Sequence, residues 1–312
     1  MNKTKYNNIW INTLGISVIT LLLTWLLYFV LDVSVFEKIT PKDSDDNVLN
    51  YLYSIENADT TIRDFENKIV IFDLKTTKSR KVIADAIRKI ENAQPKAVIL
   101  DIIFSDNSET DTITDNYLRQ TVTLYDNIYT AVRIADNNLE RSFFAHGNNI
   151  KEGLINHSST FRPYEILHGD TIYRMEYKIT GLTGKPNTNR YINFFNKYFT
   201  TLAIEQDIDA VDIKDKIVIV GNLEDLRDRH DMPFRIDGKW RIQGSVLLAH
   251  NLSTVLNNSW ITVYPNYVGW IITAIITFFF VLMSCKLKSC KRLNDALCNI
   301  IIFVSTMVVV LS

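Results

Sequence analysis

The sequence predicts an α/β fold: one domain with a largely parallel sheet covered by helices, flanked by transmembrane helices. Three observations predict it. Short, continuous apolar runs of strand length recur through the middle of the chain, helical periodicity follows two of them, and uncharged runs of membrane length lie near both ends. The average composition, with 47% hydrophobic and 22% charged residues, hides this segregation.

The uncharged runs are the first elements of the prediction. Residues 9–31 carry no charge and as a helix reach roughly 35 Å, enough for a hydrocarbon core of about 30 Å. A cleaved signal peptide is the alternative, but the length of the run favours an uncleaved anchor. Residues 268–283 form a second run behind several aromatic residues. The third run, 296–311, fits a minimal span, a re-entrant segment or the start of a truncated element.

Basic residues near the runs predict their orientation. Lys3 and Lys5 precede the first run, and four basic residues lie between the second and third runs, so both places are expected to be cytoplasmic. The protein is then a multi-pass inner-membrane protein with its main domain periplasmic. The predicted order is a cytoplasmic N-terminus (1–8), a transmembrane helix (9–31), an extracytoplasmic domain (32–266), a transmembrane helix (267–283), a cytoplasmic basic loop (284–295) and a third membrane segment (296–312).

The outward region begins with a predicted βαβ unit. KIVIFDL, residues 68–74, is a strand-length apolar run, and residues 79–94 show helical spacing with Ser79 as a possible N-cap. Pro95 ends this helix, and residues 96–104 form a second apolar strand. Continuous apolar strands joined by a helix indicate a parallel sheet covered on both faces.

The remaining elements follow the same logic. A helix with a thin apolar face is expected at 111–125, hairpins and loops fill about 136–197, and LLAHNL lies within a helix at 244–258. Two further strands are expected at 127–134 and 216–221. All three cysteines lie in or beside the C-terminal membrane segments, so the outward domain must be held by its own core.

Acidic residues mark the expected carboxyl edge of the sheet. Asp73 follows the first strand, Asp101 lies in ILDIIF, and an acidic cluster follows Gly221. Because ligands bind beyond the carboxyl ends of parallel strands, these carboxylates are candidates for holding a cation or for acid and base chemistry. The alternative is that Asp73 and Asp101 cap turns or pair with Arg80.

The charged run after Gly221, EDLRDRHDM, alternates in sign and is typical of a solvated loop. Its single histidine, His230, is either exposed, a general base or a pH-sensitive switch. Gly221 is expected to allow a tight turn at the end of the strand.

Several classes of function lack support in the sequence. The net charge is −1 and no basic run is interleaved with aromatic residues, so no nucleic-acid partner is expected. The chain has no G-x-S-x-G, P-loop or H-E-x-x-H motif. We therefore predict no catalytic residue, no bound metal and no cofactor.

The order of these segments resembles the second type of CHASE domain, the cyclase- and histidine-kinase-associated sensory extracellular domain. The resemblance covers most of residues 68–257. It rests on KIVIFDL, SRKVIADAIRKIENAQPKAVILDIIFSD, EGLIN, DTIYRM, RYINFF, DKIVIVGN and IQGSVLLAHNLSTVL, in that order between membrane runs. It implies an extracytoplasmic sensor that passes a change through membrane helices.

The resemblance also bears on single residues. Asp73, Arg80 and Asp101 match characteristic family positions, as does Gly244 at the start of the last helix. The family often carries a His-Ala-Asn step in that helix, whereas residues 248–250 are Leu-Ala-His, which puts a polar role there in doubt. The candidate ligand-binding residues are Asp73, Arg80, Asp101, Asn222, Asp225, Asp228 and His230.

The predicted function is a sensory, ligand-binding module that is not itself an enzyme. Few polar residues follow the second membrane run, so output is expected to pass to a separate cytoplasmic or membrane partner. The expected ligand is a small molecule or an envelope protein. The alternatives are a structural envelope scaffold and, less favoured, a membrane-anchored hydrolase.

Overall fold

The computed structural model divides the chain into two compact units, Leu52–Val263 and Met1–Tyr51 with Tyr264–Ser312. The predictions for the third membrane segment and for residues 287–295 lie outside the described part of the chain. The structure describes residues 10–11, 13–22, 64–104, 112–145, 150–156, 163–182, 190–194, 197–206, 208, 213–236, 239–262 and 266–286.

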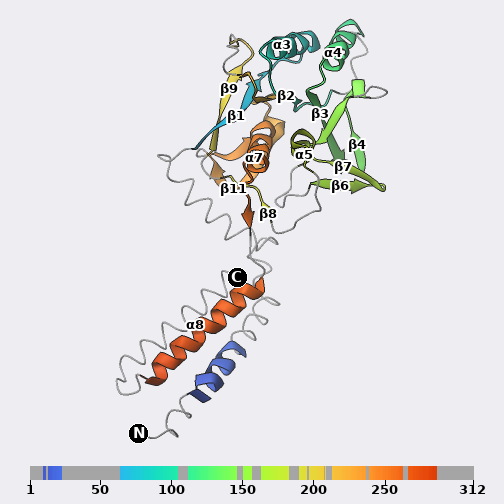
Figure 1. The fold of residues 1–312 in the computed structure, drawn as a ribbon. Helices are drawn as coiled ribbons and strands as arrows, with labels where there is room; N and C mark the ends of the chain where they lie inside the picture. The colour runs from blue at the N-terminus through green and yellow to red at the C-terminus, as the bar shows by residue number, and fades with distance from the viewer. Residues whose placement is uncertain are drawn as a thin grey trace. The chain divides into compact units, whose positions relative to one another are not determined.

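The main sheet confirms the predicted α/β class. Its described strands run in the order β4-β3-β2-β10-β1-β9, and β5 also pairs with β3 (Figure 1). All neighbours are parallel except β4, which runs antiparallel to β3. The strands are β1 (Asp64–Asp73), β2 (Ala97–Leu100), β3 (Ile128–Ala135), β4 (Asn138–Glu140), β5 (Lys151–Leu154), β9 (Lys197–Ala203) and β10 (Ile217–Gly221).

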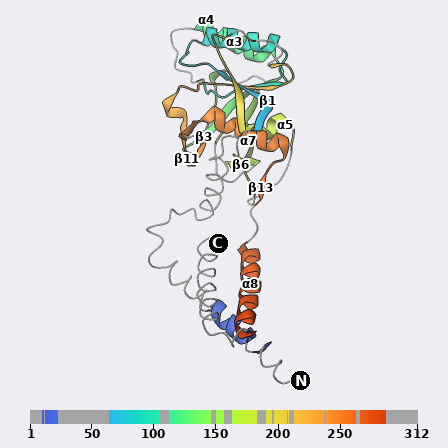
Figure 2. The same cartoon turned by 90° about the vertical axis from the view of Figure 1, so that its left-hand side faces the viewer.

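Helices cover both faces of this sheet (Figures 1 and 2). Helices α3 (Arg80–Asn92) and α4 (Thr112–Leu124) pack on one face, with Ser79 accepting a hydrogen bond from the Val82 amide as the predicted N-cap. Helices α5 (Met175–Thr180) and α7 (Gly244–Asn257) pack on the other face. The central strands β2 and β10 are therefore buried along their whole length, as their continuous apolar sequences predicted.

The alternation of side chains along each strand determines which face of the sheet the polar residues at the carboxyl ends of the strands lie on. Ile69 and Ile71 of β1, Ile217 and Ile219 of β10 and Ile99 of β2 pack with α7. Because strand side chains have a period of two, the residues that continue this series at the carboxyl ends, among them Asp73, also belong to the α7 face.

Several boundaries differ from the sequence-based expectation. The second strand ends at Leu100 rather than residue 104, since β10 pairs with it only as far as Val220↔Leu100. The middle region contains not only a hairpin, β6 (Tyr164–Leu167) with β7 (Asp170–Tyr173), but also parallel β5 and short α5. Parallel edge strand β9 was not predicted.

The charged run after Gly221 is only partly a loop. Its middle forms a short 3-10 turn, Leu226–Asp228, and strand β11 begins directly at Arg229. The expectation of a solvated loop for EDLRDRHDM is thus wrong from Arg229 onward. Strand β11 (Arg229–Ile236) forms an antiparallel hairpin with β12 (Lys239–Gln243). In this hairpin His230 lies opposite Ile242, which is buried.

The second unit contains helical residues 10–11 and 13–22 and helix α8 (Asn266–Lys286). Trp10 and Phe278 stack with ring centroids 6.0 Å apart. No helix in the described part of the chain is both long enough and apolar enough to cross a membrane.

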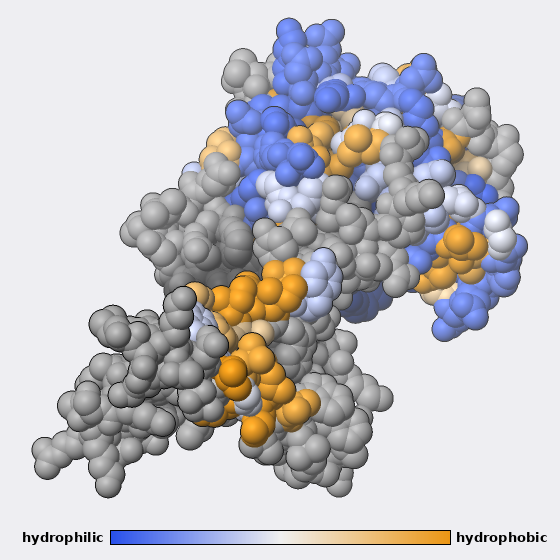
Figure 3. Space-filling view, turned by 60° about the horizontal axis from the view of Figure 1, so that its bottom comes forward, coloured by the Kyte–Doolittle hydropathy of each residue, from blue (hydrophilic) through white to orange (hydrophobic). Residues whose placement is uncertain are grey.

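Burial in this unit differs from that in the α/β domain, although Val281 and Leu282 of α8 are also buried. Its buried polar side chains are Thr13 and Ser17, one turn apart, and Thr273 and Thr277, again one turn apart. Large apolar side chains lie on the surface instead (Figure 3). These exposed residues are Trp10, Ile11, Leu14, Ile16, Val18, Ile19, Leu22, Tyr267, Ile271, Ile272, Ile275 and Phe279.

Candidate functional site

The first turn of α7 meets the carboxyl end of the sheet. The Ser245 hydroxyl donates a hydrogen bond to Asp101 Oδ2 at 2.6 Å. A Cβ on Gly221 would lie 1.9 Å from Ser245 Oγ, so only glycine lets the helix come this close. Gly221 was expected to allow a tight turn, but its φ is not positive. The close approach of Ser245 explains the glycine at this position.

Asp228 lies against the same helix start. A Cβ on Gly244 would be 2.7 Å from one Asp228 carboxylate oxygen and 2.8 Å from the other, so the carboxylate covers the first residue of α7. His230 Nε2 is 3.6 Å from Asp228 Oδ1, and both side chains are partly exposed. A negative charge at a helix N-terminus is favourable, because the first amide groups carry partial positive charge.

The environment of Asp101 disfavours its charged form. Burial raises the pKa of Asp101 to about 7; the charges of Asp228 and Glu176 act in the same direction, while Ser245 and His230 oppose them. The residue keeps some exposed surface. Asp101 is therefore a carboxyl group that can change charge near neutral pH.

Glu176, in the first turn of α5, is buried with Arg174. The two side chains are 1–2% exposed, and Arg174 Nε lies 3.6 Å from Glu176 Oε2. Arg174 also donates to the Asn156 carbonyl at 2.5 Å, which fixes the guanidinium to the segment that follows β5. Sequence reasoning missed both residues, because DTIYRME, residues 170–176, carries no periodic signal that marks Arg174 and Glu176 as buried.

Asp73 has a structural position at the edge of the site. Its Oδ1 accepts hydrogen bonds from the Lys75 amide at 2.8 Å and the Leu223 amide at 3.0 Å. These amides belong to the segments that follow β1 and β10, so one buried carboxylate holds two neighbouring turns together. This is the capping role that the sequence left open for Asp73.

Arg80 lies on the other face of the sheet. It begins α3, forms an ion pair with Asp115 of α4, and its guanidinium lies 4.5 Å from the centre of the Phe143 ring. The structure therefore does not bring Arg80 to Asp101. Arg80 is therefore not part of the predicted cluster of ligand-binding residues around Asp101.

Asn222 and Asp225 shape the segment after β10. Asn222 Oδ1 accepts from the amides of Glu224 at 2.9 Å and Asp225 at 3.1 Å. Asp225 caps the following 3-10 turn through the Arg227 amide, and its hydrogen bonds with Arg227 lower the pKa of its carboxyl group. These two residues form the rim of the site rather than its centre.

The site at the start of α7 thus consists of Asp101, Asp228, His230 and Ser245, called the carboxyl-edge site below. Its groups can accept hydrogen bonds, bind a positively charged group or exchange a proton. Within the described ranges, no three His, Cys, Asp or Glu side chains are grouped so that they could hold a metal ion. Ser245 was missed because a serine after a glycine is an ordinary helix start in sequence.

Residues 54–284 match the family model of the CHASE2 domain. The chain belongs to the CHASE2 family. This family comprises sensory extracellular domains, which confirms the resemblance inferred from the order of segments. Searches of curated proteins and of solved structures gave no match.

The CHASE2 assignment gives the carboxyl-edge site its context. CHASE2 is a family of sensory domains, and the carboxyl-edge site of this chain is a cluster of polar groups at a helix start. The matched range also includes α7 and the larger part of α8. The family is thus matched across the connection between the α/β domain and the last described helix.

Proposed function

We propose that this CHASE2 chain is a membrane-anchored sensory module. Its α/β domain lies outside the cytoplasm, binds a small ligand or an envelope protein at the carboxyl-edge site, and signals through its membrane helices to a separate partner. One observation carries the proposal: α7 begins in the carboxyl-edge site, and the chain continues from its end to α8 within a few residues.

Membrane anchoring is supported by the sequence and by burial. Residues 9–31 carry no charge, and the flanking lysines favour a cytoplasmic N-terminus. Small hydroxyl side chains inside a helix pair with large apolar side chains outside it are typical of helices packed in lipid, where small residues allow close approach. The proposed boundaries are residues 9–31 and 267–283 for two spans, with 32–266 outside.

The ligand must distinguish two conformations of the domain to transmit a signal. Asp101 and Asp228 both touch the first turn of α7, so a ligand that displaces or neutralises one of them acts directly on that helix. A positively charged or hydrogen-bond-donating group fits these acceptors best.

Membrane topology is tested with a membrane-impermeant maleimide on intact spheroplasts. The three native cysteines are replaced by serine, and Ile166→Cys places one thiol on exposed strand β6. We expect labelling without permeabilisation. The matched control keeps native Cys290 as the sole thiol, in the basic loop, and should react only after permeabilisation. The opposite pattern would reverse the proposed orientation.

Ligand binding is tested by incubating the full-length protein with an envelope extract and identifying retained molecules by mass spectrometry. Asp228→Asn should lose the bound species, because it removes the charge at the start of α7. Asp231→Asn is the matched control: it lies three residues away, and its carboxylate is 74% exposed and paired with Arg241. Equal retention by all three proteins would place binding elsewhere.

A further inference from the structure

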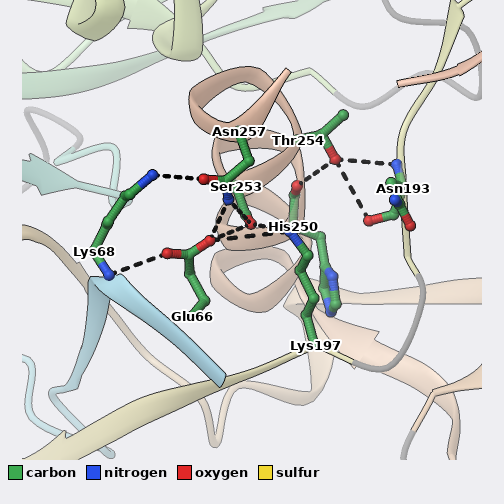
Figure 4. A network of polar contacts seen from close by, with 8 residues as sticks. All are labelled: Glu66, Lys68, Asn193, Lys197, His250, Ser253, Thr254 and Asn257. Carbon is green, nitrogen blue, oxygen red and sulfur yellow. Dashed lines mark hydrogen bonds and ion pairs between the residues drawn. The ribbon is translucent and has the colours of Figure 1, made fainter. Parts of the chain in front are cut away.

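A buried carboxylate lies near the opposite end of α7 from Asp101. Glu66, in the amino-terminal part of β1, is 6% exposed and accepts hydrogen bonds from three donors (Figure 4). These are Ser253 Oγ at 2.6 Å, Asn257 Nδ2 at 2.6 Å and the Lys68 amide at 3.1 Å. The first two donors belong to the last turns of α7, so this carboxylate ties the helix to β1.

Two lysines strengthen the same connection. Lys197 of β9 donates to Ser253 Oγ at 2.9 Å and lies 4.0 Å from Glu66 Oε2. Lys68 of β1 donates from Nζ to Asn257 Oδ1 at 2.6 Å. Glu66, Lys68, Lys197, Ser253 and Asn257, called the Glu66 network below, thus fix the end of α7 to both β1 and β9 (Figure 4).

The network favours a charged Glu66. Burial alone raises the pKa of this carboxyl group, but the hydrogen bonds from Ser253, Lys68 and Asn257 together with the charge of Lys197 outweigh it and lower the pKa. The carboxylate is therefore ionised at neutral pH. Charge-assisted hydrogen bonds are stronger than neutral ones, so the contact resists separation.

Neighbouring contacts make this end of the helix rigid. Thr254 Oγ1 accepts from the Asn193 amide at 3.0 Å and donates to the His250 carbonyl at 2.9 Å. The His250 ring lies between Phe194 and Phe199, with centroids 5.3 Å and 5.0 Å away. Burial, and to a smaller extent the positive charge of Lys197, lowers the pKa of His250 to about 3. The ring is therefore neutral and packs as an apolar group.

The two anchored ends belong to one continuous helix. Ser245 donates a hydrogen bond to Asp101 in the carboxyl-edge site and Ser253 donates one to Glu66. The two serines are eight positions apart, which corresponds to about 12 Å along the helix. Beyond α7, strand β13 (Ile261–Thr262) pairs with β8 (Arg190–Tyr191), and α8 begins at Asn266. A displacement of α7 therefore reaches the chain that leads to α8.

We propose that Glu66 is a positioning residue that makes α7 move as one body, so that a change at Asp101 reaches the last turns of the helix and the segment before α8. The proposal deepens the proposed function, because it assigns the route of the signal from the carboxyl-edge site. Without the Glu66 network, the end of α7 opens independently and a change at its start is not passed on.

The test is hydrogen exchange with mass spectrometry on the full-length protein in detergent, with Asp101→Asn as the perturbation and no ligand. We expect Asp101→Asn to speed exchange of the amides at 253–258 by about tenfold, since weakening the hydrogen bond between Ser245 and residue 101 changes a local opening equilibrium by roughly that factor. In a Glu66→Gln background these amides should already exchange fast, and adding Asp101→Asn should not increase their exchange rate further.

The matched control is Glu91→Gln on α3. Glu91 is also a partly buried carboxylate that accepts from an asparagine, Asn127, at 3.1 Å, but it lies on the other face of the sheet. In this background Asp101→Asn should keep its full effect at 253–258. If Glu66→Gln fails to fold by circular dichroism, Ser253→Ala replaces it, because it removes one donor and keeps the carboxylate.

Two outcomes would overturn the proposal. In the first, Asp101→Asn leaves the exchange rate of the amides at 253–258 unchanged in the otherwise native chain. In the second, Asp101→Asn increases this rate equally with and without Glu66→Gln. Neither outcome depends on the identity of the ligand or on membrane orientation. The maleimide and ligand-retention experiments test those parts of the proposed function separately.

Discussion

Two carboxyl groups at opposite ends of α7, the partly exposed Asp101 and the buried Glu66, have opposite electrostatics. Asp101 and Glu66 each accept a hydrogen bond from an α7 serine at 2.6 Å. Burial raises the pKa of Asp101, and the negative charges of Asp228 and Glu176 add to this effect. Burial also acts to raise the pKa of Glu66, but the hydrogen bonds from Ser253, Lys68 and Asn257 and the charge of Lys197 outweigh it and lower the pKa. The surrounding donors and charges therefore decide whether burial prevails, and so which carboxyl group can change charge near neutral pH.

We expect the largest loss of stability from removing Glu66, the carboxylate that holds the last turns of α7. Glu66→Ala leaves Lys197 and the Ser253 and Asn257 donors without their buried acceptor, so it should lower the free energy of unfolding by about 3 kcal/mol. Thermal unfolding of the full-length protein, followed by near-UV circular dichroism, measures the change. An unaltered midpoint would mean that the Glu66 network does not hold α7, and would contradict the proposed difference between the two ends of the helix.

Gly221→Ala should perturb the other end almost as strongly. The added methyl group meets Ser245 Oγ at 1.9 Å, so α7 must shift, at an expected cost of about 2 kcal/mol. The double variant Gly221→Ala with Ser245→Gly removes the clash and should recover part of the lost stability. Absence of any recovery would show that Ser245 does not set the approach of α7.

The pH dependence of stability should have opposite signs at the two ends. The folded pKa of Asp101 is raised, so its contribution is fully present below its ordinary pKa of about 4 and is lost as pH rises through about 7. Relative to Asp101→Asn, the wild type should therefore lose stability between these pH values. Unfolding midpoints from pH 4 to 8 measure this, and parallel curves would contradict it.

Glu66 gives the reverse dependence. Its folded pKa is lowered, so its contribution is present above the ordinary pKa of a glutamate and is lost as pH falls through the folded pKa. The difference between the wild type and Glu66→Gln should stay constant at neutral pH and shrink only under acid conditions. A difference that shrinks near pH 7 would mean that Glu66 is not held ionised.

The smallest effect is expected on the exposed hairpin. Asp231 and Arg241 pair across β11 and β12 with side chains 74% and 62% exposed. Exposed pairs contribute little because water screens them. Asp231→Asn should leave the unfolding midpoint unchanged, which makes it the baseline for the variants above; a clear decrease would show that the hairpin supports the carboxyl-edge site.

The sequence predicted the parts of the fold that depend on local pattern. Buried β2 and β10 follow continuous apolar runs, and Asp101 was placed at the carboxyl edge correctly. Edge strand β9 was missed because its burial alternates irregularly, and β5 because Lys151 and Glu152 interrupt its apolar signal. Short, partly exposed strands depend on their neighbours for identification.

Long-range arrangement explains the remaining differences. Arg80 was grouped with Asp101, but β10 lies between β1 and β2, and the face that α3 covers follows from the direction of that crossover. The Glu66 network joins residues 187 positions apart and leaves no periodic signal in the sequence. Such contacts become visible only when the strand order is known.

The most direct test of the sensory account is affinity capture of the full-length protein from its native membrane, followed by mass spectrometry of co-purifying proteins. The account predicts recovery of a cytoplasmic signalling protein or its membrane subunit, reduced in Glu66→Gln and retained in Glu91→Gln. Recovery of structural envelope proteins alone, equally in all three, would contradict a sensor and support a scaffold.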